Sequence, residues 1–549
     1  MNHAPDVARP ADGPIAGRRL ALTLAGLMLT LFLAALDGTI VATAMPRIVA
    51  ELHGFEKYSW VSTAYLLAST AMVPVVSKLS DIYGRKQQLV TTIIGFVAGS
   101  ALCGFAQTMD QLILFRAIQG LAGGGLFSLV FAANADIFPP AERGKWQGLF
   151  FGMITAATIV GPPVGGFLTE ALSWRWVFYV NLPVCLLALS VLAVGFPGRQ
   201  GNARGSWRQI DFVGALTLVV AITALLLSIL AGTSTNNWLQ PEVWELGALA
   251  LAAFAFFLWV EQRVADPILP LGLLKNRVVA VGTAASFLIA FLMVSTSLYA
   301  PLYIQSVLGD SPTTSGFTLM PQILTALAFN VLGGQLVSRR GRYKRIMLIG
   351  CFLLPLGLAC LVLSAPTMNR LLVVGSLMLF SAGFSMLMPQ LNVAIQNALP
   401  LRHLGAGTGM VTLIRSVGQT MGAAVVGSAV VSAYLATLAR TLPPEAASLP
   451  PEVLHSLTNP QQYLAGRSGV PLFPADLPPE LSSALLAAIR QALLGGLEAA
   501  FLTMFVVGLV AALLVAFFLP DAELRRGRPA TVMSAPVPEP ARAPAPLSS

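Results

Sequence analysis

Three charged side chains stand inside stretches of sequence that are otherwise apolar. Asp37 lies in LFLAALDGTIVATAMP, where residues 20–36 carry no charge; Arg116 lies in LILFRAIQGLAGG and Arg415 in LIRSVGQTMGAA. Ionisable groups in such surroundings are costly and commonly serve proton, ion or substrate binding. These residues are therefore the first candidates for the chemistry of this chain.

Asp37 is the candidate proton carrier. Burial raises the proton affinity of a carboxylate and a nearby cation lowers it, so a rearrangement around Asp37 would make it take up and release a proton. The alternative is a permanently ionised side chain that holds helices together. No other acidic residue falls well inside an apolar run, so few rival carboxylates exist.

The two arginines keep their charge, because a guanidinium does not lose its proton in proteins. Arg116 either tunes the protonation of Asp37 or acts as a structural hydrogen-bond donor. Arg415 has no matching acid in its half of the chain. It attracts an anionic headgroup, or repels cationic drugs, or donates to backbone carbonyls or a polar neighbour within its own domain.

The elements that must position these residues are membrane-spanning helices. Of the 549 residues, 56% are hydrophobic and 10% are charged, whereas soluble domains carry about 25% charged residues. Apolar runs of about 20 residues predict helices that cross a bilayer. The runs predict fourteen spans, at residues 20–43, 58–77, 89–107, 111–135, 146–170, 176–196, 211–231, 244–262, 278–305, 314–337, 346–364, 371–395, 405–435 and 497–519.

The distribution of basic residues predicts the orientation. The net charge of +9 comes mostly from Lys and Arg in the tails and in short loops on one side of the membrane, which membrane topology explains better than nucleic-acid binding does. An even number of spans puts both termini on that side. We therefore expect a multi-pass protein of the cytoplasmic (inner) membrane with both termini in the cytoplasm.

An internal repeat divides the chain. SKLSDIYGRKQQL after the second span aligns with GQLVSRRGRYKRI after the tenth at an offset of 257 residues, with Gly84 over Gly341 and Arg85 over Arg342. Two parallel-repeat bundles of six helices are implied. The predicted organisation is a disordered cytoplasmic tail (1–19), an N-terminal six-helix bundle (20–196), a linker with two additional spans (197–277), a C-terminal six-helix bundle (278–519) with a long outer loop (436–496), and a second disordered cytoplasmic tail (520–549).

Five motifs make the chain resemble the 14-span drug:proton antiporter branch of the major facilitator superfamily, which includes EmrB- and QacA-like multidrug exporters. They are LDGTIVATAMP, SKLSDIYGRK, LILFRAIQGLAGG, GPPVGG and WRWVFYVNLP. The resemblance implies an all-α fold of two six-helix bundles related by a pseudo-two-fold axis, with a substrate cavity between them that opens alternately to each side. It also implies that the two additional helices lie outside this core, and that Arg116 takes part in proton transfer.

The resemblance gives the loop after the second span the role of a cytoplasmic latch. Its expected members are Asp81, Gly84, Arg85 and, at the end of the fourth span, Asp136. Gly84 permits a tight turn, and Asp81 can meet the positive end of the following helix. The second copy has Ser338 in place of the aspartate, so only the first half can make this charged latch. A purely topogenic basic loop is the alternative.

The fifth span carries the motif that the family associates with antiport, at Gly161, Pro162, Gly165 and Gly166. Gly161 and Gly165 share one helical face, where a second helix can approach closely. From the physics alone the motif predicts tight packing. The resemblance favours export over import.

Candidates for the lining of the substrate cavity come from polar and aromatic residues within the spans. Tyr299 and Tyr303 share a helical face, as do Asn392 and Gln396, although hydrogen bonding between helices explains the amides equally well. The candidates are Gln119, Tyr299, Tyr303, Asn392, Gln396 and Arg415.

The sequence predicts a proton-coupled antiporter that exports amphipathic small molecules. A single coupling acid favours neutral, zwitterionic or anionic substrates, or monovalent cations with modest accumulation, over divalent cations. We expect a monomer with small amphipathic substrates, protons and membrane lipids as partners, and no nucleic acid, cofactor, metal site or enzymatic activity. The alternatives are a lipid or glycolipid transporter (flippase) of the same fold and, from another class, a non-transporting membrane sensor or a membrane-embedded enzyme.

Overall fold

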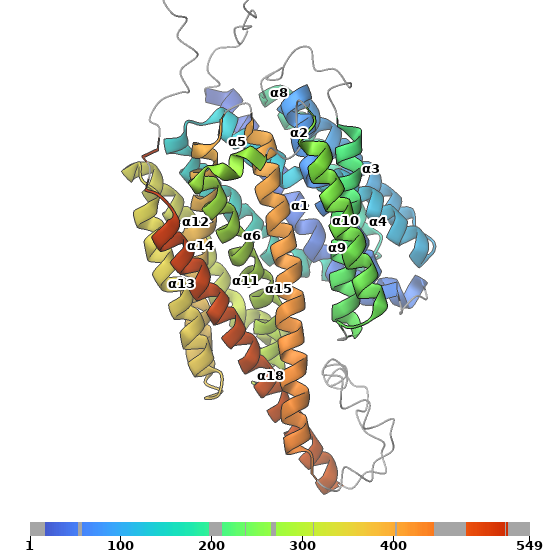
Figure 1. The fold of residues 1–549 in the computed structure, drawn as a ribbon. Helices are drawn as coiled ribbons and strands as arrows, with labels where there is room; N and C mark the ends of the chain where they lie inside the picture. Colours follow the sequence, from blue (N-terminus) through green and yellow to red (C-terminus); the bar gives the residue numbers. More distant parts are fainter. Residues whose placement is uncertain are drawn as a thin grey trace, which may run out of the picture.

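The computed structural model describes residues 17–52, 57–196, 211–235, 238–264, 271–310, 312–400, 403–443, 479–521 and 523–524. Within these residues it contains fourteen helical segments long and apolar enough to cross a membrane, which confirms the predicted number of spans. Figure 1 shows them as one bundle. The helices are α1 (Gly17–Leu52), α2 (Tyr58–Tyr83), α3 (Arg85–Phe105), α4 (Met109–Gly123), α5 (Leu126–Ile137), α6 (Pro140–Ala171), α7 (Trp176–Tyr179), α8 (Asn181–Gly195), α9 (Phe212–Thr235), α10 (Pro241–Glu261), η3 (Leu271–Lys275), α11 (Arg277–Ser306), α12 (Pro312–Arg340), α13 (Lys344–Ser364), α14 (Arg370–Ala398), α15 (Leu404–Thr441), α18 (Pro479–Leu513) and η6 (Leu514–Phe518).

The predicted fourth span is interrupted by a run of glycines. It consists of α4 and α5, separated at Gly124 and Gly125. A Cβ on Gly124 would overlap the backbone oxygen of Ser69, and a Cβ on Gly125 would overlap the side chain of Val76. The missing side chains therefore let α2 approach the fourth span closely.

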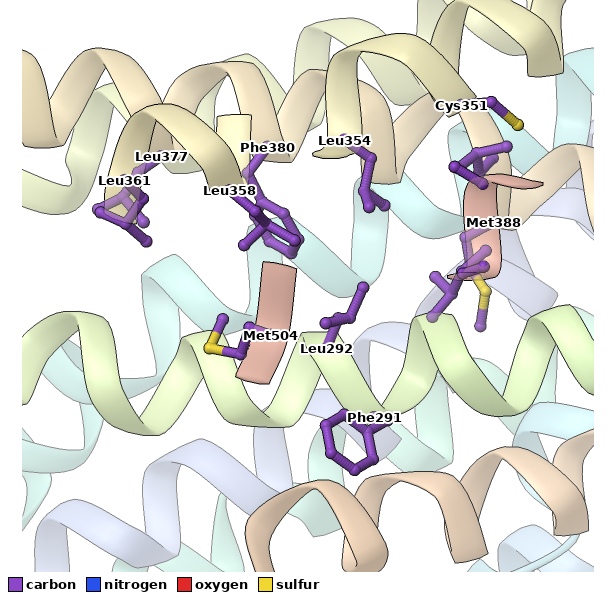
Figure 2. Packing of buried hydrophobic residues seen from close by; sticks show 14 of the residues in the cluster. Phe291, Leu292, Cys351, Leu354, Leu358, Leu361, Leu377, Phe380, Met388 and Met504 are labelled. Atoms are coloured by element: carbon purple, nitrogen blue, oxygen red, sulfur yellow. The ribbon is translucent and has the colours of Figure 1, made fainter. Parts of the chain in front are cut away.

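The hydrophobic core is divided between the two halves. One cluster joins α11, α13, α14 and α18 of the second half, and Figure 2 shows part of it, including Leu292, Leu358, Phe380 and Met504. Separate clusters join the helices of the first half. Each half therefore has a packed interior of its own, as rigid-body movement between them would require.

The two additional helices lie against the join between the halves. A cluster links Leu218, Ile222 and Leu226 of α9 with Ala71 of α2 and Met410 of α15, and α9 contacts both α2 and α15. Trp238, between α9 and α10, donates a 3.1 Å hydrogen bond to Ser428 of α15. This helix pair covers one of the two sides on which the halves meet.

The end of the chain differs from the prediction. The segment 481–496, predicted as part of the outer loop, is helical and continuous with the last span in α18. Its apolar face packs on α15 through Leu485, Ile489 and Leu493 against Tyr434 and Leu438. In Figure 1 the two helices extend past the rest of the bundle.

Length explains this extension. The 38 residues of α15 rise roughly 57 Å at about 1.5 Å per residue, whereas the hydrocarbon core of a membrane is about 30 Å thick.

Most of each predicted tail, parts of the linker (197–210 and 265–270) and residues 444–478 of the outer loop fall outside the described residues. The division into domains stays a prediction.

The contact between α13 and α14 depends on the size of Gly357. A Cβ there would overlap the backbone nitrogen of Phe380, so we expect Gly357→Ala to destabilise the protein by about 1–3 kcal/mol, as overpacking does. Gly375→Ala is the control, because a Cβ there meets nothing within 4 Å and helical Gly→Ala stabilises by about 0.5–1 kcal/mol. Thermal unfolding in detergent should show a lower Tm for the first variant only. Equal Tm values for the two variants would contradict this packing.

Candidate functional site

Asp37 and Arg116 form an ion pair inside the first half. Arg116 Nη1 lies 2.7 Å from Asp37 Oδ2, and the two side chains are 2% and 0% exposed. Asp37 Oδ1 also accepts hydrogen bonds from Gln119 Nε2 at 3.1 Å and Asn181 Nδ2 at 2.9 Å. The contact left open by the sequence between Asp37 and Arg116 is therefore present in this structure.

Four helices supply this charge network, which we define as Asp37 of α1, Arg116 and Gln119 of α4, Asn181 of α8 and Ser100 of α3. Arg116 Nη1 donates a second bond to Gln119 Oε1 at 2.8 Å, and Asn181 Nδ2 donates to Ser100 Oγ at 3.0 Å. A buried charge pair is tolerated only where its remaining donors and acceptors are satisfied. The network meets that condition for both carboxylate oxygens.

Tyr65 of α2 separates the charge network from the space between the halves. The Arg116 guanidinium carbon lies 4.2 Å from the centre of the Tyr65 ring, in cation–π geometry. The ring also lines the cavity described next. Two glycines of α4 let α2 approach this closely, since a Cβ on Gly120 would lie 2.5 Å from Tyr65 O and one on Gly123 2.9 Å from Tyr65 Oη.

A central cavity of about 290 Å³ lies between the halves. Its walls come from α1, α2, α4, α5 and α6 on one side and from α11, α12, α14 and α15 on the other. They carry aromatic rings, among them Phe127, Phe131 and Phe384, several hydroxyls and amides, and one charged side chain, Arg415. Such a lining fits a small amphipathic molecule.

Of the six residues predicted to line the cavity, only Arg415 does so. Gln119 belongs to the charge network. Gln396 bridges the halves instead, because it accepts a 2.7 Å hydrogen bond from Gln147 and donates one of 3.1 Å to Phe131 O. Gln396 therefore has the alternative role suggested for the amides, hydrogen bonding between helices.

The two tyrosines and Asn392 also lie away from the central cavity. Tyr303 is fully buried, and its hydroxyl donates a 2.7 Å bond to Ala365 O. Tyr299 packs against the same core of the second half, and Asn392 is buried in α14. The spacing of these residues fixes a common helical face, but not the neighbour that this face meets.

Arg85 and Asp136 meet at one end of the bundle, which we call the basic end because it holds the turns at Gly84 and Gly341. Arg85 Nε lies 2.8 Å from Asp136 Oδ2, and Arg85 also pairs with Asp81. Gly84 and Gly341 both adopt positive φ, 93° and 70°, where other residues would be strained. The latch role of these residues stays a prediction.

Asp81 meets the start of the following helix, α3, through the side chain of Arg85. The backbone N–H groups that donate to it belong to another helix, to Gly405 at 3.1 Å and Ala406 at 2.8 Å. These belong to the first turn of α15 in the other half. The free N–H groups and positive end of a helix attract a carboxylate, and Gly405 leaves room for it, since a Cβ there would overlap Asp81.

Further contacts close the basic end. Ser338 accepts a 3.0 Å hydrogen bond from the backbone of Lys145 in α6, so the serine that replaces the aspartate in the second copy also bridges the halves. A Cβ on Gly148 would overlap the backbone oxygen of Asn330, and one on Gly334 that of Gly144. α6 and α12 are therefore in backbone contact at this end.

The glycines of the fifth span pack on α1 next to Asp37. A Cβ on Gly161 would overlap Thr39, and one on Gly165 would overlap Thr43. Gly166 has nothing within 4 Å of such an atom, and Pro162 is exposed. The motif thus sets the distance between α6 and the helix that carries the buried carboxylate.

Comparisons with known proteins decide the family. Residues 27–423 match the model described as the Major Facilitator Superfamily. The chain belongs to the Major Facilitator Superfamily. This membership confirms the expected fold and makes the chain a multi-pass membrane transporter, not an enzyme, and its fourteen spans fit the 14-span branch.

Named relatives of this superfamily member include bacterial drug transporters. It is 33% identical over 522 residues to "Multidrug transporter protein MdtP" of Bacillus subtilis (strain 168), covering 93% of this chain and 94% of that protein. It is 34% identical over 403 residues to "Multidrug resistance protein 3" of the same organism, covering 73% and 78%. A solved structure of the proton:xylose symporter XylE shares the fold, with a TM-score of 0.59 at 12% identity over 92% of this chain and 97% of that one.

Sequence reasoning assigned no role to Tyr65, Ser100 or Asn181 of this transporter. Asn181 offered a signal, because it is an amide in the apolar run of the sixth span, but its partner lies 144 residues away.

The structure also changes the position of Glu498 relative to its helix. The predicted span put it at the edge, whereas it lies in the middle of α18, and is therefore a second carboxylate within a long apolar helix. Among the described residues no group of His, Cys, Asp or Glu is arranged to hold a metal ion.

Removing the Asp81 carboxylate should loosen the contact between α2 and α15. Each hydrogen bond to a charged group is worth about 1.5–3 kcal/mol, so in Asp81→Ala we expect amide hydrogen exchange of Gly405 and Ala406 to be at least about tenfold faster. Asp110→Ala is the control, because Asp110 pairs with Lys57 at an exposed site. Mass spectrometry of peptides from the start of α15 measures the difference. Unchanged exchange in Asp81→Ala would show that this contact does not hold the helix start.

Proposed function

We propose that the protein is a proton-coupled antiporter, which exports amphipathic small molecules across the cytoplasmic membrane by alternating access. The observation that carries the proposal is the buried Asp37–Arg116 pair, separated from a cavity between the halves by one aromatic ring. The names of the two Bacillus relatives support drug-like substrates.

In the proposed cycle Asp37 is the proton carrier and Arg116 its partner. Protonation of Asp37 removes the negative charge, so Arg116 loses its ionic partner and keeps only the Gln119 acceptor in the network. A buried guanidinium without a counter-charge is unfavourable. The arrangement of α1, α4 and α8 would then change, and with it the relative stability of the inward-facing and outward-facing shapes.

The described shape fits one stage of this cycle. Contacts of Asp81, Gln147 and Ser338 close the basic end, which the positive-inside rule assigns to the cytoplasm. We infer an outward-facing state in which Asp37 awaits a proton from outside, with the latch formed by Asp81, Arg85 and Asp136. The working unit in this proposal is a monomer in the inner membrane with both termini in the cytoplasm and no cofactor.

The proton gradient supplies sufficient energy. One proton that moves down 100 mV and one pH unit releases roughly 2.3 plus 1.4 kcal/mol. For a neutral substrate this sustains a concentration ratio of several hundred, because each 1.4 kcal/mol is about a factor of ten.

Lipid transport remains the second candidate. An apolar groove of about 790 Å³ runs between α9 and α10 on one side and α11 and α15 on the other, lined by residues such as Leu225, Phe254, Phe287 and Val417. A groove of this kind would accept an acyl chain.

Asp37→Asn should abolish substrate export driven by a pH gradient in proteoliposomes, because the amide cannot carry the proton, while folding and substrate binding persist. Glu498→Gln is the matched control: it alters the other carboxylate in a long apolar helix, and we expect transport within about twofold of wild type. Uphill transport that survives in Asp37→Asn would refute the assignment. Movement of a headgroup-labelled lipid, with no drug moved by the gradient, would favour the lipid transporter.

Tyr65→Ala should open the charge network to the central cavity. A cation–π contact is worth about 0.5–2 kcal/mol, so we expect a several-fold increase in substrate-independent proton flux and a matching loss of coupled export. Tyr65→Phe keeps the ring and should keep the coupling. A pH-sensitive dye trapped in the liposomes reports the flux. If the Phe variant leaked as strongly as the Ala variant, the hydroxyl rather than the ring would be the essential part.

A further inference from the structure

We propose that the substrates are amphipathic organic anions, each with an apolar body and one carboxylate, and that Arg415 binds the carboxylate in the central cavity. This rests on the proposed function and names the substrate class of the same site. Three features support it: the charge of the cavity, the polar groups in its wall, and the engagement of the Asp37 carboxylate by other residues.

Among the residues that the structure describes, Arg415 is the one charged residue that lines the central cavity. Two other buried arginines of the described chain pair with carboxylates, Arg116 with Asp37 and Arg85 with Asp136. Arg415 differs, because its recorded contact within the described residues is the face of Phe131, 5.9 Å from the guanidinium carbon to the ring centre. The cavity therefore carries an uncompensated positive charge.

An unpaired guanidinium in such a place favours an anionic ligand. It presents five N–H donors in a planar fork that matches the two oxygens of a carboxylate. Burial has removed part of its hydration, and a ligand carboxylate would replace the lost interactions. A cationic ligand would meet repulsion with no acid to offset it.

The surroundings of Arg415 suit the rest of such a molecule. Ser385 Oγ is buried in the wall of the same cavity without a hydrogen-bond partner, so a small shift of this wall would let its hydroxyl donate to an anionic oxygen. Phe127, Phe384 and Met293 supply apolar walls. One positive fork, several hydroxyl and amide groups and the aromatic walls of the cavity are complementary to one carboxylate on an apolar body.

The charge network does not neutralise Arg415. Asp37 is engaged by Arg116, Gln119 and Asn181, and the Tyr65 ring lies between Arg116 and the cavity. While Asp37 is ionised the pair adds no net charge, and once Asp37 is protonated Arg116 adds a second positive charge. An anion is therefore favoured in both protonation states.

This substrate class has an electrical consequence. Inward movement of one proton and outward movement of one monovalent anion transfers two charges, whereas a neutral substrate transfers one and a monovalent cation none. An inside-negative potential alone should therefore accelerate export of an anion most strongly.

The test uses three dansyl probes with one apolar body: dansylglycine (a carboxylate), its neutral amide, and a dansyl quaternary ammonium compound. Fluorescence titration of the purified full-length protein should show the carboxylate bound at least about tenfold more tightly than the ammonium probe. Arg415→Gln should bring the two affinities within about threefold, and Arg415→Lys should keep their order. Arg440→Gln, on the exposed end of the same helix, is the control and should match wild type.

Equal or tighter binding of the ammonium probe by wild type would overturn the proposal, as would no binding of dansylglycine, or a carboxylate preference that survives in Arg415→Gln. The neutral amide separates this failure from failure of the proposed function. If a pH gradient drives export of the amide in wild type but not in Asp37→Asn, the antiporter proposal stands whatever the charge preference. If the pH gradient moves none of the three probes, both the antiporter proposal and the anion proposal fail.

Discussion

The structure of the first half is organised around one buried ion pair. Asp37 and Arg116 are held out of water by four helices, and a charge in that position is stable only while its partner and its amide donors stay in place. The packing around α1 serves this end. Gly161 and Gly165 bring α6 against the next turns of α1, and Tyr65 closes the side that faces the cavity. A change in the protonation of one carboxylate therefore bears on the positions of several helices at once.

The basic end shows how the repeat has become asymmetric. In the first copy Asp81 accepts two backbone bonds from the start of α15 and pairs with Arg85. In the second copy Ser338 accepts a single bond from Lys145. Both residues bridge the halves at equivalent positions, but a charged acceptor at a helix start is stronger than a hydroxyl. The two sides of this closure are thus held with unequal strength.

The sequence predicted the fold well because membrane-spanning helices are recognisable as long apolar runs. All fourteen spans were predicted from this property. It also pointed to Asp37 and Arg116, since charge within apolar runs is conspicuous. It did not predict the partners of these residues. Asn181 and Tyr65 are ordinary polar or aromatic residues in their helices, and only the packing of distant segments brings them to the ion pair.

Five of the six residues expected to line the substrate cavity lie outside the central cavity for a related reason. Helical periodicity shows which residues share a face, but not which neighbour that face meets, because this depends on how each helix is rotated about its axis. Gln396 faces Gln147 of the other half, and Tyr303 faces the core of its own half, where it bonds to Ala365. The length of α18 was missed because segment 481–496 finds its apolar partner in α15, which no local pattern reveals.

The helix pair α9 and α10 breaks the symmetry of the two bundles in a way that bears on access from the lipid. It lies along the seam between α2 and α15, whereas at the opposite seam α6 and α12 meet without comparable contacts to α9 or α10. A compound that first dissolves in a leaflet and then diffuses sideways toward the chamber would find one flank shielded. The other flank is uncovered, but α6 and α12 are in backbone contact there at the basic end. A membrane-dissolved solute would therefore reach the chamber from that end only after these two helices separate.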